Sequence, residues 1–220
     1  MKYLITFEKG ESVRWLGHLD ILRTFERAIR RADLPIAFSS GFNPREKLAF
    51  ASALSVGITA SADPATIELT DALPPDLLIS RLNEKLPPGI QLQSAQEIPD
   101  TGSRDLLNRY DRAEFFVTCV TRSEPPLAEI QASADTLLHR ESLVVERERE
   151  GKVKRVDIRP FVHSIAADSV QNGRITFTMI LGIGMEGVAK PQEIVGFMAN
   201  DLAGLAVRRI HRARLIPKPD

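Results

Sequence analysis

His18 and Asp20 are the residues of this chain that most resemble acid–base machinery, and they lie two positions apart in the stretch Gly-His-Leu-Asp. A histidine can take the proton of a ribose 2′-hydroxyl at neutral pH, and a nearby guanidinium group can stabilise the charge that develops on the phosphate. Arg23 and Arg27 stand close enough in sequence for that role. A structural role is also open, because a carboxylate in the first turn of a helix interacts favourably with the helix dipole.

The segment that follows these two residues is rich in arginine. Positions 14 to 31 hold five arginines and two carboxylates, an excess of three positive charges on a chain whose formal net charge is zero. Pairs such as Asp20 with Arg23 and Glu26 with Arg30 would make a solvated face of ion pairs. The remaining guanidinium groups favour phosphate, because the planar fork binds two oxygens at once. The residues predicted to bind RNA or phosphate are Arg23, Arg27, Arg30, Arg31, Phe42, Asn43, Arg45, Arg208 and Arg212.

The chain closes with a second basic run, VRRIHRARLIPK, at residues 207–218. If this run is a strand, Arg208, Arg212 and Arg214 share one face, because side chains alternate along a strand. The run contains no acidic residue, so ion pairs within it cannot neutralise these groups. Basic clusters on an otherwise neutral chain indicate a polyanion site, most simply RNA.

The turn SSGFNPREK, residues 39–47, connects the arginine-rich segment to the next apolar run. Gly41 can take a positive φ and Asn43-Pro44 favours a turn, so this segment is at least a tight connection. Backbone N–H groups in such a turn can also cradle an anion. Phe42 and Trp15 are the aromatic residues outside periodic apolar patterns that best suit stacking on a base.

Two later motifs are open to the same pair of interpretations. VDIRPF, residues 156–161, places Asp157 and Arg159 on one strand face, which predicts a structural ion pair. GMEGVAKPQE, residues 184–193, places two glycines and Lys190 before a helix, whose N-terminus attracts anions. This spacing matches no phosphate-loop pattern.

The composition excludes several classes of protein. The single cysteine, Cys119, permits no disulfide within the chain and no cysteine-held metal or iron–sulfur cluster, and it is expected to be a buried thiol. The histidines lack metal spacing, so no metal or other cofactor is expected. No apolar run approaches the roughly 20 residues that span a bilayer, and charges interrupt the N-terminus too early for a signal peptide. We therefore expect a soluble, cytoplasmic protein.

The first half of the chain alternates between the periodicities of strands and helices. Leu19, Leu22, Phe25, Ile29 and Ala32 recur at helical spacing, and the helix must stop before Pro35. A second helix is expected to begin at Asp71 or at Pro74-Pro75 and to end at Pro87-Pro88-Gly89. The order is strand, helix, strand, strand, helix, strand, as in the ferredoxin-like arrangement. The strands are predicted at residues 2–8, 47–54, 65–70 and 90–98.

The second half repeats this order with an extra hairpin around Gly151. Helices are expected over residues 127–140 and 191–205. The predicted fold is therefore α+β, with two tandem ferredoxin-like (βαββαβ) units of antiparallel sheet at 1–99 and 113–220, joined by a linker at 100–112. A single larger α+β domain with one continuous sheet is the alternative. The strands are predicted at residues 114–121, 142–149, 152–159, 161–168, 174–184 and 206–216.

The stretch from His18 to Phe50 resembles the signature of the radical-SAM-linked protein family, a bacterial family encoded beside, or fused to, a radical S-adenosylmethionine enzyme. The family pattern has a Ser-His-Leu-Asp opening, spaced arginines, a Gly-Phe-Asn-Pro turn and a later Val-Gly. Gly17 stands where the family usually has serine, and Arg45 stands where a histidine is common. The matching residues are His18, Leu19, Asp20, Arg23, Arg27, Ala28, Arg30, Arg31, Ala32, Gly41, Phe42, Asn43, Pro44, Val56, Gly57 and Val156–Phe161.

The resemblance implies a radical S-adenosylmethionine enzyme as partner, and it supplies no activity. The leading interpretation is a non-catalytic companion of that enzyme, which binds RNA or another phosphate-rich substrate through its arginines. A protein–protein adaptor that docks the radical enzyme is the first alternative. The second is a metal-independent endoribonuclease that uses His18, by analogy of fold with the CRISPR repeat-RNA endoribonucleases.

Overall fold

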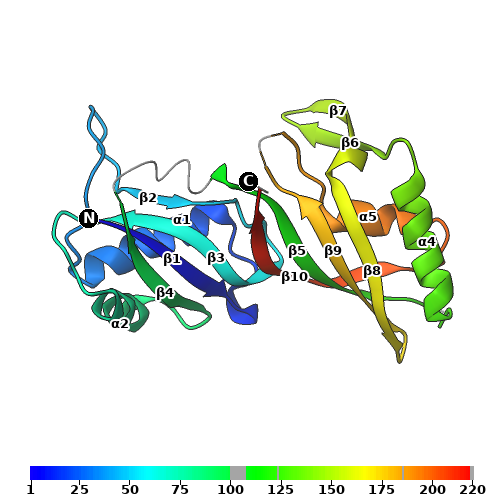
Figure 1. The fold of residues 1–220 in the computed structure, drawn as a ribbon, viewed down its shortest axis with the longest axis horizontal. Helices are drawn as coiled ribbons and strands as arrows, with labels where there is room; N and C mark the ends of the chain where they lie inside the picture. Colours follow the sequence, from blue (N-terminus) through cyan, green and yellow to red (C-terminus); the bar gives the residue numbers. More distant parts are fainter. Residues whose placement is uncertain (100–107, 123, 185, 219–220) are drawn as a thin grey trace. The chain divides into compact units, whose positions relative to one another are not determined.

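The computed structural model describes residues 1–99, 108–122, 124–184 and 186–218. The chain divides into two compact units, Met1–Tyr110 and Asp111–Asp220. Each unit is of the α+β class and combines antiparallel strands with helices (Figure 1). Most of the predicted linker lies outside the described residues, and its positions 110–112 already belong to a strand.

Unit 1 has the order of elements that the sequence predicts for residues 1–99. Its sheet is antiparallel, with β1 between β3 and β4, and β2 pairs with the other side of β3. The elements are β1 (Lys2–Lys9), α1 (His18–Arg31), β2 (Leu48–Phe50), β3 (Ile58–Glu68), α2 (Pro75–Lys85) and β4 (Ile90–Ile98).

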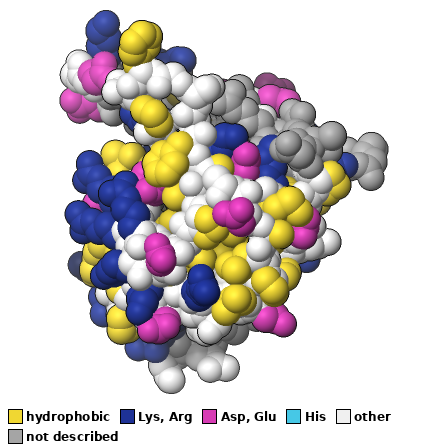
Figure 2. Space-filling model, turned by 90° about the vertical axis from the view of Figure 1, so that its left-hand side faces the viewer, with side chains coloured by type: hydrophobic (Ala, Val, Ile, Leu, Met, Phe, Trp, Pro, Cys, Tyr) yellow, Lys and Arg dark blue, Asp and Glu magenta, His cyan; other side chains and the backbone are white. Residues whose placement is uncertain are grey.

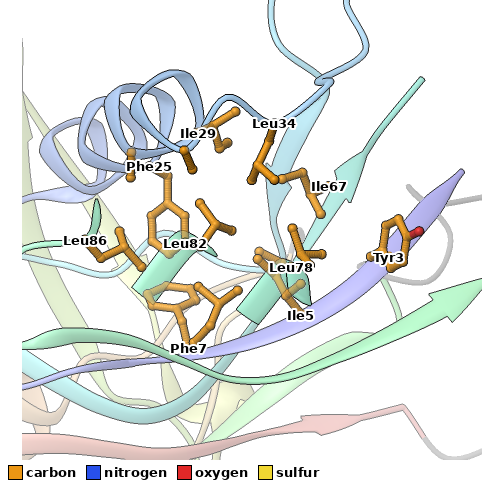
Figure 3. Close-up of a cluster of buried hydrophobic side chains, with 14 of the residues drawn as sticks. Tyr3, Ile5, Phe7, Phe25, Ile29, Leu34, Ile67, Leu78, Leu82 and Leu86 are labelled. Atoms are coloured by element: carbon orange, nitrogen blue, oxygen red, sulfur yellow. The ribbon is translucent and has the colours of Figure 1, made fainter. Parts of the chain in front are cut away.

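The core of unit 1 lies between its sheet and helices α1 and α2 (Figure 3). Alternate residues of β1 point into it, and Tyr3, Ile5 and Phe7 are at most 1% exposed. The ring of Phe7 meets that of Phe25 from α1 edge-on, with centroids 5.1 Å apart. Leu78 contributes from α2 on the same side of the sheet.

The buried face of α1 differs from the predicted one. The helix buries Ile21, Phe25, Ala28 and Ile29, whereas Leu19 is 62% exposed. The predicted and the observed sets both have helical spacing and share Phe25 and Ile29. Periodicity alone therefore could not distinguish two buried faces that differ by a rotation of about one residue. The rotation turns the arginines directly away from the core.

Strand lengths were also mispredicted around Pro64. β2 covers only Leu48–Phe50, and β3 begins at Ile58, several residues before the predicted start. Proline lacks a backbone donor and usually marks a strand edge or an irregular position, which made 58–64 look unlike a strand. The register between β1 and β3 shifts next to this position, between Phe7 and Lys9, so the ladder accommodates it.

Unit 2 combines antiparallel strands with a separate two-stranded hairpin. Among these strands β5 lies between β10 and β9, and β8 pairs with the other side of β9, while β6 and β7 pair with each other. α5 ends well before the predicted residue 205, because the chain turns after Met198. The elements are β5 (Tyr110–Val120), α4 (Leu127–His139), β6 (Val144–Arg149), β7 (Lys152–Asp157), β8 (Val162–Gln171), β9 (Arg174–Gly182), α5 (Pro191–Met198) and β10 (Ala206–Pro217).

The cysteine of unit 2 is a buried free thiol, as predicted. Cys119 lies on β5 with 0% of its surface exposed, and burial raises its pKa to about 12. Such a thiol stays protonated at neutral pH and is inert as a nucleophile. Within the described residues, no helix is both long enough and apolar enough to cross a membrane.

Candidate nucleic-acid interface

The outward side of α1 carries a stripe of arginines. At 100° per residue, Arg23, Arg27 and Arg30 fall within an arc of about 60°, on the side opposite Phe25 and Ala28. Arg23 and Arg27 are exposed and make no side-chain hydrogen bond or ion pair with any residue that the structure describes. Figure 2 shows a view in which Lys and Arg side chains gather along one edge. These two guanidinium groups are therefore available to a ligand.

Arg30 has an internal partner, and it is not the predicted Glu26. Its Nε donates to Oε1 of Glu46 at 2.7 Å, and the Glu46 side chain is only 2% exposed. This hydrogen bond is the main reason why the pKa of Arg30 is raised. The second oxygen of Glu46, Oε2, accepts no hydrogen bond from the described residues. Arg30 thus neutralises a buried carboxylate and ties α1 to the segment that contains Glu46.

Arg31 also serves the unit itself. Its Nη2 donates to the backbone carbonyl of Lys85, the last residue of α2, at 2.5 Å. A guanidinium group at the C-terminus of a helix satisfies a free carbonyl and interacts favourably with the dipole. Arg31 therefore fastens α1 to α2.

The segment 37–47 projects from unit 1 as a narrow loop (Figure 1). Its two sides are joined by hydrogen bonds from Ser39 N to Arg45 O and from Lys47 N to Ala37 O, both 2.8 Å. Ser39 Oγ accepts from Arg45 N at 3.0 Å, so this hydroxyl is used inside the loop. The loop turns at Gly41, whose φ of 127° suits glycine.

The tip of this loop presents Phe42, Asn43 and Arg45 to solvent. Phe42 is 107% exposed, so its ring packs against nothing in the described part of unit 1. Asn43 and Arg45 are exposed as well. The Arg45 side chain, like those of Arg23 and Arg27, makes no ion pair or hydrogen bond with a described residue.

A second exposed aromatic residue lies just before α1. Trp15 is 66% exposed, and the guanidinium carbon of Arg14 sits 4.5 Å from the centroid of its ring. Arg14 also pairs with Glu11. A Cβ added at Gly57 would lie 3.6 Å from the Trp15 ring, which places residue 57 beside it.

A buried lysine, which the sequence did not single out, supports the Trp15 region. Lys9 ends β1 and is 0% exposed. Its ammonium group donates to the carbonyls of Arg14 at 3.0 Å, Leu16 at 2.7 Å and Ser55 at 3.4 Å. A buried charge needs such partners, so Lys9 fixes the two loops on either side of the N-terminus of α1.

His18 and Asp20 have structural surroundings at the start of α1. Oδ2 of Asp20 accepts a hydrogen bond from the backbone N–H of Gly17 at 3.0 Å. The His18 ring lies edge-on against Phe50, with centroids 5.6 Å apart. Capping and packing therefore account for both side chains.

The arginines of β10 are used differently from those of α1. Arg208 is exposed, but Arg212 is only 3% exposed and so cannot contribute to an open phosphate surface. Arg214 pairs with Glu114 of β5, with Nε and Oε2 2.9 Å apart. The expected face of three free arginines is therefore absent from the described β10.

The predicted ion pair between Asp157 and Arg159 is not among the side-chain contacts of the described residues, where Asp157 meets the backbone of Arg159 instead. Asp157 Oδ1 accepts from the backbone N–H of Leu143 at 2.8 Å and of Arg159 at 3.0 Å, and these hydrogen bonds lower its pKa. The Arg159 guanidinium instead donates to the carbonyls of Val162 and Leu138. Each side chain thus satisfies backbone groups where β7 ends and the chain turns into β8.

The fold of the chain is similar to that of chains in three solved complexes. A chain in a Cbf5-Nop10-Gar1 complex matches with a TM-score of 0.60 at 10% identity, over 97% of this chain and 48% of that chain. An H/ACA RNP bound to a substrate RNA containing 2′-deoxyuridine and an archaeal box H/ACA sRNP Nop10-Cbf5 complex each match with a TM-score of 0.54 at 10% identity, over 97% of this chain and 47% of theirs. The protein therefore spans about half the length of these chains, and the likeness shows the fold alone.

Sequence comparison places the chain in a family. It matches none of the curated proteins with which it was compared. Residues 2–191 match the pattern of a family described as an uncharacterized protein conserved in bacteria. Because the match covers most of the chain, from β1 to the start of α5, the protein belongs to the DUF2344 family.

Proposed function

We propose that unit 1 binds single-stranded RNA through an arginine surface, made of Arg23, Arg27 and Arg45 with the exposed rings of Trp15 and Phe42. The observation that carries the proposal is the state of the three arginines. All are exposed, and none makes a side-chain hydrogen bond or ion pair with a described residue. Asp20 and Glu26 flank the stripe on α1, but neither makes an ion pair with these three arginines.

The two arginines of α1 suit a strand backbone. Arg23 and Arg27 are one turn apart, about 6 Å along the helix axis, so they can contact neighbouring phosphates. Each guanidinium can donate two parallel hydrogen bonds to one phosphate. Arg30 is a positioning residue in this proposal, because releasing Glu46 would leave a buried carboxylate without its partner.

The aromatic rings would supply the contacts to bases. Base stacking on an exposed ring contributes about 1–3 kcal/mol per base and tolerates any sequence. Phe42 and Trp15 are the most exposed aromatic side chains among the described residues. Lys9 and the Arg30–Glu46 pair hold the segments that carry these rings, so both are presented by fixed backbone.

The fold supports the proposal in a general way. We propose that both units are ferredoxin-like, because the strand orders β4-β1-β3-β2 and β10-β5-β9-β8 follow the same scheme around their helices. A protein of similar fold occurs in the H/ACA RNP bound to a substrate RNA. At 10% identity that likeness names no RNA and no residue for this protein.

A salt series with wild type and one double variant tests the proposal. On single strands the logarithm of the binding constant falls by about 0.7 per phosphate contact for each tenfold rise in salt. Arg23→Gln/Arg27→Gln should therefore reduce the slope by about 1.4 and weaken binding at low salt. The matched control is Arg122→Gln/Arg174→Gln in unit 2, which removes the same charge from two exposed positions. Equal slopes for both double variants would refute the arginine surface.

A protein partner for the same surface is the second candidate. The apolar side chains of Trp15, Leu19 and Val56 are 66%, 62% and 56% exposed, which favours contact with another protein. From the resemblance to radical-SAM-linked proteins, we propose a radical S-adenosylmethionine enzyme as that partner. Pull-down of that enzyme after exhaustive nuclease treatment separates the candidates, since Arg23→Glu/Arg27→Glu should abolish it only if the arginines meet acidic protein.

We leave His18 out of the proposed function. The contact of its ring with Phe50 and the capping role of Asp20 explain why both are present. If His18 were instead a general base, His18→Ala would slow RNA cleavage in chelator by about 100-fold or more at unchanged affinity. We expect wild type and His18→Ala to leave RNA equally intact.

A further inference from the structure

Two motifs that the arginine surface does not use meet in unit 2. VDIRPF ends at Phe161 after β7, and the glycine-rich stretch that begins at Gly182 follows β9. Together they line a cavity of about 180 Å³. We call it the Phe161 pocket, and the lining residues used below are Asp111, Phe161, His163, Gly184, Glu186 and Gly187, with Lys218 at its edge.

One wall of the pocket is an aromatic ring packed on bare backbone. A Cβ added at Gly187 would lie 2.0 Å from Cζ of Phe161, and one added at Gly182 would lie 2.9 Å from its Cβ. Both distances are far below van der Waals contact, so the ring occupies the space that side chains would fill. Glycine is therefore needed at positions 182 and 187 because the Phe161 ring packs there. The glycines do not need a phosphate loop to explain them.

The backbone beyond Gly187 is held in place by Arg147 of β6. Its guanidinium binds Glu193 at both carboxylate oxygens, at 2.8 and 2.7 Å, and donates to the carbonyl of Val188 at 2.7 Å. Glu193 also accepts from Lys190 N at 2.9 Å, at the start of α5. The wall of the pocket is therefore prearranged, as in a binding site.

Several polar groups at the pocket lack internal partners. Asp111 receives one hydrogen bond, from Arg112 Nε to Oδ1 at 3.2 Å, which leaves Oδ2 unpartnered among the described residues. The ring nitrogens of His163 and the backbone N–H groups of Gly184 and Gly187 likewise make no hydrogen bond with them. The pocket thus offers both acceptors and donors.

Charged groups of both signs surround the pocket. The carboxylates are Asp111 and Glu186, and the cations are Arg112, Arg159 and Lys218, whose Nζ lies 3.4 Å from Glu186 Oε1. Partial desolvation lowers the pKa of His163, whose surface is otherwise exposed; the nearby Arg112 and Arg159 add to this effect and Asp111 opposes it. The imidazole is therefore neutral at pH 7, with one nitrogen that donates and one that accepts. Because carboxylates and cations both lie around the pocket, they select neither an anion nor a cation, which favours a neutral ligand with hydrogen-bond donors and acceptors.

We propose that the Phe161 pocket binds one planar heteroaromatic base, either a nucleotide of a bound RNA or a free nucleoside. Such a ring is neutral, carries donors and acceptors on one edge, and packs well against an aromatic side chain. The volume would hold about six waters, enough for a single base. The lining residues all belong to unit 2, so the site does not depend on the arginine surface.

Uncharged nucleosides provide the direct test, because they lack the phosphate that the arginine surface would bind. The full-length protein is titrated with guanosine, cytidine, adenosine and uridine, and the ring resonance of His163 is followed by NMR, with His163→Gln for assignment. At least one nucleoside should shift this resonance in a saturable way. The pKa of His163 should also change on saturation, since the ligand displaces water from the ring.

Asp111→Asn and Gly184→Val probe the pocket by chemistry and by shape. The first variant converts an acceptor-only group into an amide. The second adds a side chain at Gly184, where even a single added Cβ would lie 3.3 Å from Cβ of Asp111. Each should weaken the nucleoside at least about tenfold. Asp168→Asn is the control, an exposed carboxylate on β8 outside the pocket, and it should bind as wild type. Thermal unfolding of each variant checks that the fold is kept.

The same variants identify the source of the base. A loss of RNA affinity in Asp111→Asn with normal Asp168→Asn assigns the base to RNA, whereas nucleoside binding that is lost without any change in RNA affinity assigns it to a free nucleoside. Nucleoside binding that survives both pocket variants overturns the proposal. It is equally overturned if no nucleoside shifts His163 and Asp111→Asn binds RNA as wild type.

Discussion

The arginines of α1 and those of unit 2 have the same chemistry but different neighbours. Arg23 and Arg27 bind no described residue, whereas Arg147, Arg159 and Arg214 bind carboxylates or carbonyls of their own unit. The number of arginines in a segment therefore does not locate a binding surface. Exposed arginines without a described partner also occur in unit 2, at Arg122, Arg174 and Arg208. What distinguishes Arg23 and Arg27 is that two such arginines lie one turn apart on one helix face.

Secondary structure explains much of this difference. On β10 the Arg214 side chain stands beside β5, where Glu114 supplies a partner across the strands. On α1 the outward face has no neighbouring element, so only the i±3 and i±4 positions or a nearby loop can supply a partner. Arg30 finds Glu46 in this way, while Arg23 and Arg27 find none.

The largest stability effect should come from Arg147→Ala. It removes both hydrogen bonds to Glu193, whose side chain is 16% exposed, and the one to the Val188 carbonyl. Leaving these acceptors partly buried and unsatisfied should lower the free energy of unfolding by about 2–3 kcal/mol. Arg23→Ala, on the open stripe, should change it by less than about 0.5 kcal/mol. Urea unfolding of both variants measures this difference in stability. Equal shifts of the two unfolding midpoints would contradict the prediction.

A smaller effect is expected for Arg30, the member of the stripe that has a partner. Arg30→Ala leaves the buried Glu46 carboxylate unpaired, so its urea midpoint should fall below that of Arg27→Ala but stay above that of Arg147→Ala. Adding Glu46→Gln removes the stranded charge and should recover part of the loss. If the double variant is no more stable than Arg30→Ala, the pair does not have this role.

The sequence predicted the elements better than their faces and ends. β4 was predicted within its observed bounds, Ile90–Ile98, because proline and glycine stand on both sides of it. The burial of Cys119 was predicted as well. The rotated face of α1 and the early start of β3 were missed, since periodicity tolerates a shift of one residue and Pro64 imitates a boundary.

The hydrogen-bond and ion-pair partners of the charged side chains could not be predicted from the sequence. Glu46 is sixteen positions after Arg30, so the spacing rule that suggested Glu26 could not find it. Lys9 occupies an ordinary strand position, and its carbonyl acceptors come from two separate loops. The pocket also joins distant segments, but the pairing of a ring in VDIRPF with clustered glycines was a signal present in the sequence.

Arg214→Gln should have a weaker effect than the changes above. Arg214 is 64% exposed and Glu114 18% exposed, and open ion pairs of this kind contribute about 0.2–1 kcal/mol. We expect a loss of about 0.5 kcal/mol in the free energy of unfolding, and a smaller loss in high salt. RNA affinity should match wild type in a filter-binding assay. A change in affinity as large as that of Arg23→Gln/Arg27→Gln would extend the RNA surface to β10.

The smallest expected effect is a pH dependence from His163, on which the arginines of unit 2 also act. Its pKa in the folded protein lies below the ordinary 6.5, first because of burial and then because of Arg112, while Asp111 opposes the shift. The unfolded chain therefore binds more protons between the two pKa values, and stability falls as pH drops below about 6.5. Above that pH the contribution is constant.

His163→Gln should remove this part of the pH dependence. The difference in urea midpoint between neutral pH and a pH just below the folded pKa should be smaller in the variant than in wild type. Arg112→Gln should raise the pKa of His163, as measured by NMR titration of its ring, because a nearby positive charge is lost. Arg174→Gln, a described arginine that does not contribute to this shift, should leave it unchanged. If the pKa of His163 is unchanged in Arg112→Gln, the arginines of unit 2 bind carboxylates and backbone carbonyls of that unit but do not determine the electrostatics of the pocket.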